Sequence, residues 1–460
     1  MSHDSTRLFG TDGIRGRFGE PPLDRATVTS LAVQLAATLY ERGERGERGG
    51  GSPPRVVLGG DTRESTPEIC RWLAAGLAAG GVDLRYAGVI PTPGVAYLAR
   101  ETGAAAGVVV SASHNPFPDN GVKLIDPQGT KWSDEDELAL ERRLAPGAGE
   151  VPDLPQGQPE VEPELRELYL RHLASTLPEG RPLAGLRVVL DAGNGAASTY
   201  AGELFERLGA GVTLLHAEPD GRNVNEGCGS TAPAGMAARV AAEGADLGAA
   251  FDGDADRCIL ADEKGTVRDG DAILYLWATC LHRSGRLIPP RIVATSMSNL
   301  GLERALAAEG IGLVRCAVGD RYVVEAMREE GLLLGGEQSG HIVQSHLAST
   351  GDGLLTAIQM AFLRHQDGRP LSEMLAPFRG YPQILLNVRV KRKVDFEALP
   401  TVAAAARSVE ERLGGDGRLV LRYSGTEPLA RIMIEGPEQG MIDSLAGEIA
   451  TAIRGELGAG

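Results

Sequence analysis

The segment Pro54-Arg-Val-Val-Leu-Gly-Gly60 decides the fold, because it is a short apolar run ending in small residues and its layout recurs twice. The copies are Leu186-Arg-Val-Val-Leu-Asp-Ala192 and Pro290-Arg-Ile-Val-Ala-Thr-Ser296. Short runs rich in β-branched residues predict buried strands. Three copies of one layout within a chain of 460 residues predict three related domains.

Each of these strands is followed by a helical pattern and then by a second apolar run. The expected helices cover 66–79, 198–208 and 300–309, and the expected second strands cover 82–89, 212–216 and 312–317. Buried strands that alternate with helices predict α/β domains with mixed or mostly parallel sheets. Beyond about residue 376, the order strand, helix, strand, strand, helix predicts a smaller C-terminal α+β domain.

The repeats suggest a division of the chain into four domains. Each of the three repeats ends in a polar loop, and such loops beyond the carboxyl ends of strands meet at one side of an α/β sheet. We therefore expect the domains to surround a central cleft. Residues 41–54 predict a surface loop, and the Pro-rich acidic stretch 146–163 predicts a linker. The expected domains are 1–155, 156–262, 263–375 and 376–460.

Composition narrows the class of partner. The net charge of −16 argues against nucleic acid and acidic membranes, although a few arginines in a cleft still suit an anionic small molecule. No signal peptide and no apolar run of about 18 residues is visible, so a cytoplasmic protein is expected. The cysteines predict reduced thiols, because they are scattered and odd in number; they are Cys70, Cys228, Cys258, Cys280 and Cys316.

The sharpest motif is Asp252-Gly-Asp-Ala-Asp-Arg257, in which three carboxylates alternate with the two smallest residues. A bound cation would relieve their repulsion, and oxygen ligands suit Mg²⁺ or Ca²⁺ rather than zinc. An EF-hand is one alternative, since Glu263 falls at loop position twelve. However, Arg257 stands at position six, where that loop needs glycine. A solvated acidic turn is the other alternative.

Three further loops carry candidate chemistry. In Ser111-Ala-Ser-His-Asn-Pro116, the hydroxyl of Ser113 beside His114 is a candidate nucleophile or phosphate carrier, although such clusters are often plain turns. Lys123, a short hairpin away, is a candidate proton shuttle if its pKa is lowered. Glu337-Gln-Ser-Gly-His341 offers groups that suit sugar hydroxyls, and a polar turn is its alternative.

Two glycine-containing loops complete the set of candidate sites. Arg422-Tyr-Ser-Gly-Thr-Glu-Pro428, with Arg431 just beyond, forms a plausible phosphate cradle but lacks the end of a Walker loop. Gly10-Thr-Asp-Gly-Ile-Arg-Gly16 follows no strand and so fails the dinucleotide test, which leaves Arg15 as a candidate anion contact.

These motifs, in this order, resemble the α-D-phosphohexomutase superfamily over nearly the whole chain. The resemblance implies a four-domain isomerase that carries a phosphoserine at Ser113 and binds one Mg²⁺. The implied metal ligands are that phosphoserine with Asp252, Asp254 and Asp256. Arg257 would contact the transferring phosphoryl group, Glu337 and Ser339 would bind the sugar, and Lys123 and His341 are candidates for proton transfer. The implied phosphate-binding residues are Arg422, Ser424, Gly425, Thr426 and Arg431.

Within the superfamily, the sequence is most similar to the bacterial branch that acts on glucosamine phosphate. The features that favour this branch are Phe9–Gly16 in the first domain, the segment Cys228-Gly-Ser-Thr231, the segment Val318-Gly-Asp-Arg321 and Gln338. We therefore expect interconversion of glucosamine 6-phosphate and glucosamine 1-phosphate through a 1,6-bisphosphate. The alternatives are mannose or glucose phosphate as substrate, a metal-dependent sugar phosphatase, and a non-catalytic binding protein. The expected oligomeric state is a monomer or a homodimer.

Overall fold

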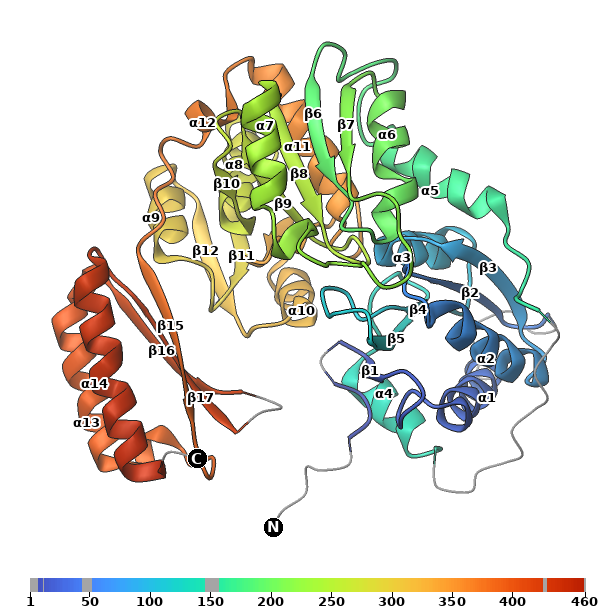
Figure 1. Ribbon diagram of the computed structural model, residues 1–460, viewed down its shortest axis with the longest axis horizontal. Coiled ribbons are helices and arrows are strands. Elements are labelled where there is room, and N and C mark those ends of the chain that lie inside the picture. The colour runs from blue at the N-terminus through green and yellow to red at the C-terminus, as the bar shows by residue number, and fades with distance from the viewer. Residues whose placement is uncertain (1–6, 11, 44–51, 145–156, 425–427, 459–460) are drawn as a thin grey trace.

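The structure is a computed structural model that describes residues 7–10, 12–43, 52–144, 157–424 and 428–458. In this part of the chain, the strands form four sheets, one in each of four successive units. The units follow one another round an arc, from the blue N-terminal unit to the red C-terminal unit (Figure 1). Three α/β units and a final α+β unit are the fold that the sequence predicts, while the domain limits at 155, 262 and 375 remain a prediction.

The first sheet has the strand order β1-β5-β4-β2-β3, with β2, β3 and β4 parallel and β1 and β5 antiparallel to their neighbours. Alternate residues of β2 face opposite sides: Val56 packs with α1 and α2, whereas Val57 packs on the side of α3. Both faces are covered, which explains why the strand is apolar throughout. The elements are β1 (Ile14–Arg17), α1 (Arg25–Arg42), β2 (Arg55–Gly60), α2 (Thr66–Ala79), β3 (Asp83–Val89), α3 (Thr92–Glu101), β4 (Ala106–Val110), β5 (Asp119–Ile125) and α4 (Asp134–Glu141).

The second unit repeats this plan with the order β10-β9-β8-β6-β7, in which the three parallel strands β8, β6 and β7 again lie together at one end of the sheet and the other two strands are antiparallel. The expected strand 212–216 is observed one residue earlier, so His216 lies just outside it. The elements are α5 (Pro163–Ser175), β6 (Arg187–Asp191), the short 3-10 helix η2 (Ala196–Thr199), α6 (Ala201–Arg207), β7 (Gly211–Leu215), η3 (Gly229–Thr231), α7 (Ala234–Glu243), β8 (Leu247–Phe251), β9 (Cys258–Asp262) and β10 (Val267–Arg268).

The third unit has a four-stranded sheet in the order β12-β11-β13-β14. Its last long helix, α11, packs against β8 and β9 of the second sheet (Figure 1). The second and third units are therefore connected by packing contacts as well as by the chain itself. The elements are α8 (Gly270–Arg283), β11 (Arg291–Thr295), α9 (Leu300–Ala308), β12 (Gly312–Cys316), α10 (Asp320–Glu330), β13 (Leu334–Gly336), β14 (Ile342–Gln344), α11 (Gly353–Asp367) and α12 (Leu371–Met374).

The fourth unit is an antiparallel sheet in the order β15-β17-β16, with two long helices packed on it. The predicted order of strand, helix, strand, strand and helix is confirmed, with a short 3-10 helix just before the first long helix. The elements are β15 (Gln383–Arg389), η4 (Phe396–Ala398), α13 (Pro400–Leu413), η5 (Gly414–Asp416), β16 (Arg418–Tyr423), β17 (Leu429–Glu435) and α14 (Gln439–Leu457).

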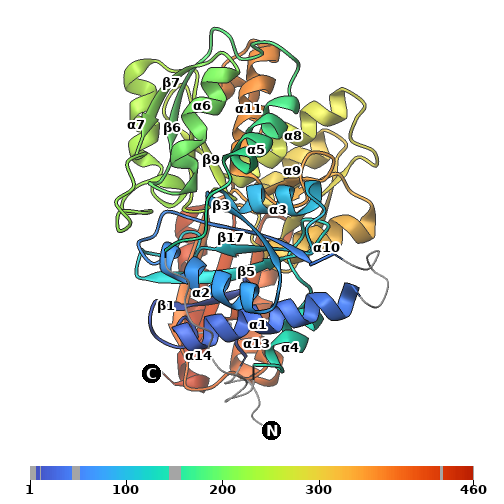
Figure 2. The ribbon, with the colours of Figure 1, turned by 90° about the vertical axis from the view of Figure 1, so that its right-hand side faces the viewer.

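The cores divide the molecule unevenly. One continuous cluster of buried side chains runs through the first three units, from Val57 through Tyr169 and Phe251 to Ile292. The fourth unit has a separate core, with Ile432 and others. In Figure 2, the second and third units stand next to each other above the first unit. The first three units therefore share packing that the fourth lacks.

A polar contact joins the fourth unit to the third. Arg418 donates hydrogen bonds of 2.8 Å to the carbonyl oxygens of Ser296 and Ser298. Glu435 pairs with Arg418 at 2.8 Å and accepts a hydrogen bond from the backbone N–H of Leu300. Interfaces of this polar kind permit relative motion more readily than a shared apolar core.

Candidate active site

The Ser113 loop begins where β4 ends, at the carboxyl edge of the first sheet. Ser113 is buried and has a φ of 51°, in the left-handed region that non-glycine residues rarely adopt. Its Oγ donates a 2.6 Å hydrogen bond to Oδ2 of Asp252, and its N–H donates to Oγ of Ser111 at 2.9 Å. The hydroxyl is thus held toward the carboxylates of the second unit.

Asp252, Asp254 and Asp256 lie on the turn between β8 and β9, at the corresponding edge of the second sheet. All three are buried, and they offer carboxylate oxygens that lie within 4.8 Å of one another. Ala255 between them has a left-handed φ of 54°. Burial, followed by the charges of Asp256 and Asp254, raises the pKa of Asp252 well above its usual value.

These three carboxylates fit a hard divalent cation. The Oδ1 atoms of Asp254 and Asp256 are buried and have no hydrogen-bond partner within the described residues. Buried charged oxygens without a partner are costly, and a bound cation satisfies them. An all-oxygen donor set suits Mg²⁺.

Lys123 on β5 approaches the same carboxylates from the first unit. Its Nζ donates to Oδ2 of Asp254 at 2.9 Å and lies 3.2 Å from Oδ2 of Asp12. Burial on its own would lower the pKa of Lys123, but the carboxylates of Asp12, Asp254 and Asp256 raise it well above its ordinary range. Lys123 therefore holds its proton, the opposite of what a general base would require.

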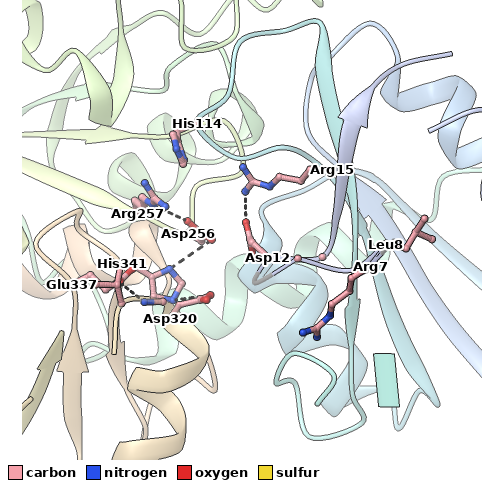
Figure 3. A pocket seen from close by; sticks show the side chains of 14 residues that line it. Arg7, Leu8, Asp12, Arg15, His114, Asp256, Arg257, Asp320, Glu337 and His341 are labelled. Carbon is pink, nitrogen blue, oxygen red and sulfur yellow. Dashed lines mark hydrogen bonds and ion pairs between the residues drawn. The ribbon is translucent and has the colours of Figure 1, made fainter. Parts of the chain in front are cut away.

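His341 is placed between two carboxylates of different units. Its Nδ1 lies 3.6 Å from Asp256, and its Nε2 lies 3.8 Å from Asp320 on α10. Burial would lower the pKa of His341, but the attraction of Asp256 and then of Asp320 raises it to about 9. In Figure 3, His341 faces Asp12 and Arg15 across the cavity.

His114 and two arginines border the Ser113 hydroxyl. Nδ1 of His114 lies 3.3 Å from Oγ of Ser113. Burial, helped by the positive charges of Arg257 and Arg15, lowers the pKa of His114 to about 4, so the imidazole is neutral near pH 7. Arg15 donates to Oδ1 of Asn115 at 3.1 Å. The two guanidinium groups give this side of the cavity a positive field that suits an anion.

The sugar-loop candidates lie at the carboxyl end of β13. Oε1 of Glu337 accepts a hydrogen bond of 3.1 Å from the backbone N–H of Gly319, while Ser339 is exposed. Two cavities meet here and share His114, Arg257 and Glu337 in their linings. One has a volume of about 510 Å³ and is drawn in Figure 3; the other has a volume of about 750 Å³ and is also lined by Ser339.

The cradle candidates come from the fourth unit. Arg422 and Arg431 are opposite one another on the antiparallel strands β16 and β17, and Arg431 reaches the larger cavity. Burial and the nearby charge of Arg431 lower the pKa of Arg422. Arg431 also donates to Oγ of Ser424 at 3.4 Å. Two adjacent guanidinium groups favour an anion between them. Gly425 and Thr426 lie outside the described residues.

Three residues that the motif analysis did not select support this site. The side chain of Arg63 is fully buried and donates to Asp61 at 2.8 Å and to the carbonyl oxygens of Ser113, Asn115, Pro116 and Asp119. Thr92 donates to Oδ2 of Asp254 at 2.6 Å, and Asp12 pairs with Lys123, Lys131 and Arg15. Arg63 could have been selected because it follows β2, one of the repeated strands.

Fold and site together define a class of protein: four units contribute residues to two adjoining cavities, which are lined by His114, Asp256 and arginines and lie beside the buried hydroxyl of Ser113. The chain belongs to the phosphoglucomutase/phosphomannomutase family. The alpha/beta/alpha domains I, II and III and the C-terminal domain of that family match residues 6–148, 167–265, 269–381 and 385–452 in turn.

Similar proteins agree with this membership. The chain is 46% identical to phosphoglucosamine mutase of Solibacter usitatus, over 98% of this chain and 99% of that protein. It is 45% identical to phosphoglucosamine mutase of Thioalkalivibrio sulfidiphilus, over 97% and 98% of the two chains. A phosphoglucomutase/phosphomannomutase family protein of Burkholderia thailandensis has the same fold, with a TM-score of 0.79 at 24% identity and coverage of 99% and 98%. None of the helices in the described ranges has the length and apolar character that a membrane crossing needs.

Proposed function

We propose that this protein is a mutase that interconverts glucosamine 6-phosphate and glucosamine 1-phosphate. The observation that carries the proposal is the 2.6 Å hydrogen bond between Oγ of Ser113 and the carboxylate trio, beside a cavity that Arg431 reaches from the opposite unit. The names of the similar curated proteins support glucosamine phosphate as the substrate. The expected bacterial-branch segments at residues 228–231 and 318–321 contribute Ser230, Thr231 and Val318 to the same cavity.

In the proposed reaction, Ser113 carries the phosphoryl group. The 6-phosphate of the substrate binds Arg422, Ser424 and Arg431, and O1 of the sugar attacks the phosphorus atom, so that the O1–P bond forms and the Oγ–P bond breaks. The 1,6-bisphosphate then turns round, and Oγ takes the phosphoryl group from O6. Gly425 and Thr426 are proposed for the same cradle.

The other cavity residues position and neutralise charge. Arg257 and Arg15 would bind the phosphoryl oxygens, and Glu337 and Ser339 would hold sugar hydroxyls. One proton leaves the attacking hydroxyl, and one returns to the leaving oxygen. Lys123 and His341, which contact Asp254 and Asp256, are the proposed groups for proton transfer, and His114 would stand beside the oxygen of Ser113.

The proposed metal site consists of the Ser113 phosphate together with Asp252, Asp254 and Asp256. When bound there, Mg²⁺ supplies charge neutralisation for the transferring phosphoryl group. The proposal also includes a cytoplasmic location, in line with five free cysteines, and a monomeric or homodimeric state.

A substrate panel tests this proposal. The protein is incubated with Mg²⁺, a trace of glucose 1,6-bisphosphate and the 6-phosphate of glucosamine, mannose or glucose, and the 1-phosphates and inorganic phosphate are measured. We expect the highest kcat/KM for glucosamine 6-phosphate and no accumulation of inorganic phosphate. A higher kcat/KM for mannose 6-phosphate or glucose 6-phosphate would identify that sugar phosphate as the preferred substrate instead. Release of inorganic phosphate would indicate a phosphatase, and absence of turnover would indicate a binding protein.

A further inference from the structure

A second group of metal-ligating side chains lies in the second unit and takes no part in the proposed reaction. It consists of Asp191, His216 and Cys228, each of which offers one ligand atom within 4.8 Å of the other two. Asp191 is the last residue of β6, and His216 directly follows β7, which pairs with β6 in parallel. Cys228 immediately precedes η3. Three segments that are separate in the sequence therefore bring one carboxylate, one imidazole and one thiol together.

We propose that Asp191, His216 and Cys228 form a binding site for a zinc-type transition-metal ion, separate from the magnesium site. Sulfur and imidazole nitrogen are ligands that zinc and cobalt prefer, whereas magnesium requires oxygen. The chemistry of the two groups therefore selects different ions. The proposal does not depend on the mutase reaction.

The distances within the cluster fit tetrahedral coordination. Nδ1 of His216 lies 3.0 Å from Oδ1 of Asp191. Two ligands that are each about 2.0–2.1 Å from a zinc ion are separated by slightly more than this, so a small outward movement would admit the ion. Coordination through Nδ1 of His216 uses the neutral imidazole with its proton on Nε2, and coordination through Sγ of Cys228 would release the thiol proton to solvent.

The backbone fixes the carboxylate in place. Oδ1 of Asp191 accepts a 3.0 Å hydrogen bond from the N–H of Gly193, and Oδ2 accepts one of 3.0 Å from the N–H of Gly229. Because ligands are usually oriented by such partners, Asp191 is already arranged as a coordinating group. Each carboxylate oxygen still has a second lone pair available for a metal.

Burial and exposure are distributed as in an open metal site. Asp191 and Cys228 are buried, whereas the side chain of His216 is 41% exposed. The exposed imidazole provides an entry path and leaves one side for a water molecule as a fourth ligand. Three protein ligands with one open position are typical of zinc sites that are not purely structural.

The backbone next to the cluster packs against the turn between β8 and β9 that carries the proposed magnesium ligands. A Cβ atom added at Gly229 would be 2.4 Å from the carbonyl oxygen of Phe251, and one added at Gly193 would be 2.9 Å from it. The N–H of Ala196 donates to the carbonyl oxygen of Gly253 at 2.8 Å. The two sites thus share packed backbone but no ligand.

Cobalt is a suitable probe, because a thiolate ligand gives Co²⁺ a charge-transfer absorption that oxygen ligands do not give. Metal-free full-length protein is titrated with Co²⁺ in the presence of excess Mg²⁺, which occupies the aspartate site. We expect one equivalent of Co²⁺ to bind with this absorption, and one equivalent of Zn²⁺ to displace it. Absence of the absorption at one equivalent would overturn the proposal.

Matched variants assign the ligands. Cys228→Ser should remove the absorption, whereas Cys316→Ser, at a half-buried cysteine of the third unit, and Asp252→Asn should retain it. If Cys228→Ser fails to fold, His216→Ala at the exposed position decides. Loss of residues that merely orient ligands lowers metal affinity by about 10- to 100-fold, so loss of the imidazole should lower it by at least as much. An unchanged affinity in His216→Ala, or an absorption that persists in folded Cys228→Ser, would overturn the proposal.

Discussion

Oγ of Ser113 and Oδ2 of Asp252 are 2.6 Å apart, although 139 positions separate the two residues in the chain. The contact joins the carboxyl end of β4 in the first unit to the carboxyl end of β8 in the second. It exists because both loops leave their sheets at equivalent edges that face each other. A hydroxyl is thereby placed beside the carboxylates that fit a cation.

The first prediction concerns the hydroxyl itself. Ser113→Ala should lower kcat by at least about 10³-fold, as expected for loss of a nucleophile, while Tm changes little. Conversion of glucosamine 6-phosphate to the 1-phosphate measures the effect. In addition, intact mass after incubation with glucose 1,6-bisphosphate should show a phosphate adduct in the wild type only. Ser345→Ala, at an exposed serine, is the control. Ordinary turnover in Ser113→Ala would exclude the phosphoserine mechanism.

The second prediction concerns the fourth unit. Arg431→Ala should raise KM by about 10- to 150-fold, because a hydrogen bond to a charged group contributes about 1.5–3 kcal/mol. The effect on kcat should be smaller, since this cradle would hold the phosphate that is not reacting. Steady-state kinetics check this, with Arg412→Ala on the exposed side of α13 as the control. An unchanged KM would remove Arg431 from the cradle.

The fold was accessible from sequence because its strands are buried on both faces. Continuous β-branched runs such as 54–60 are distinctive, and their repetition predicted three related units that the structure confirms. Strand ends were less certain: His216 was included in a strand, but its φ of 46° places it in a turn. The pattern of apolar residues predicts which side chains are buried. It does not predict the backbone conformation of the residue at which a strand ends.

Local sequence motifs identified the residues that would take part in the reaction, but they did not identify the residues that support them. Asp252 and its neighbours form a local pattern, so their spacing alone suggested a cation. Arg63 and Thr92 act through partners that lie 50 and 162 positions away, at Ser113 and Asp254. Such long-range hydrogen bonds leave no local pattern and require the folded chain.

The third prediction tests this hidden support. Arg63→Lys should destabilise the first unit, because lysine lacks the fork that reaches Asp61 and the carbonyl oxygens together, and each buried acceptor left without its donor costs about 1–3 kcal/mol. Tm should fall, and kcat should fall with it as the Ser113 loop loosens. Arg71→Lys, on the half-exposed side of α2, is the control. Equal Tm values for Arg63→Lys and the wild type would contradict the role of Arg63.

The last prediction concerns pH and the joint between the third and fourth units. Asp271 on α8 is buried and accepts a hydrogen bond of 2.7 Å from the backbone N–H of Asn299, which in turn binds the carbonyl of Tyr381. Burial, followed by the charge of Asp269, raises the pKa of Asp271 to about 7. Between the ordinary carboxyl pKa and this value, the folded protein binds a proton that the unfolded chain does not. The contribution to stability is therefore present at low pH and is lost as pH rises to about 7.

Asp271→Asn removes this titration while keeping an oxygen that accepts from the N–H of Asn299. Thermal unfolding is followed from pH 4.5 to pH 8. As pH rises, the contribution of Asp271 to the Tm of the wild type should decrease, and the variant should show no such decrease. The Tm of the variant should therefore rise relative to the Tm of the wild type as pH increases. Asp416→Asn, at an exposed carboxylate of the fourth unit, should leave the wild-type profile unchanged. A pH-independent difference in Tm between Asp271→Asn and wild type would show that Asp271 titrates alike in the folded and unfolded chain.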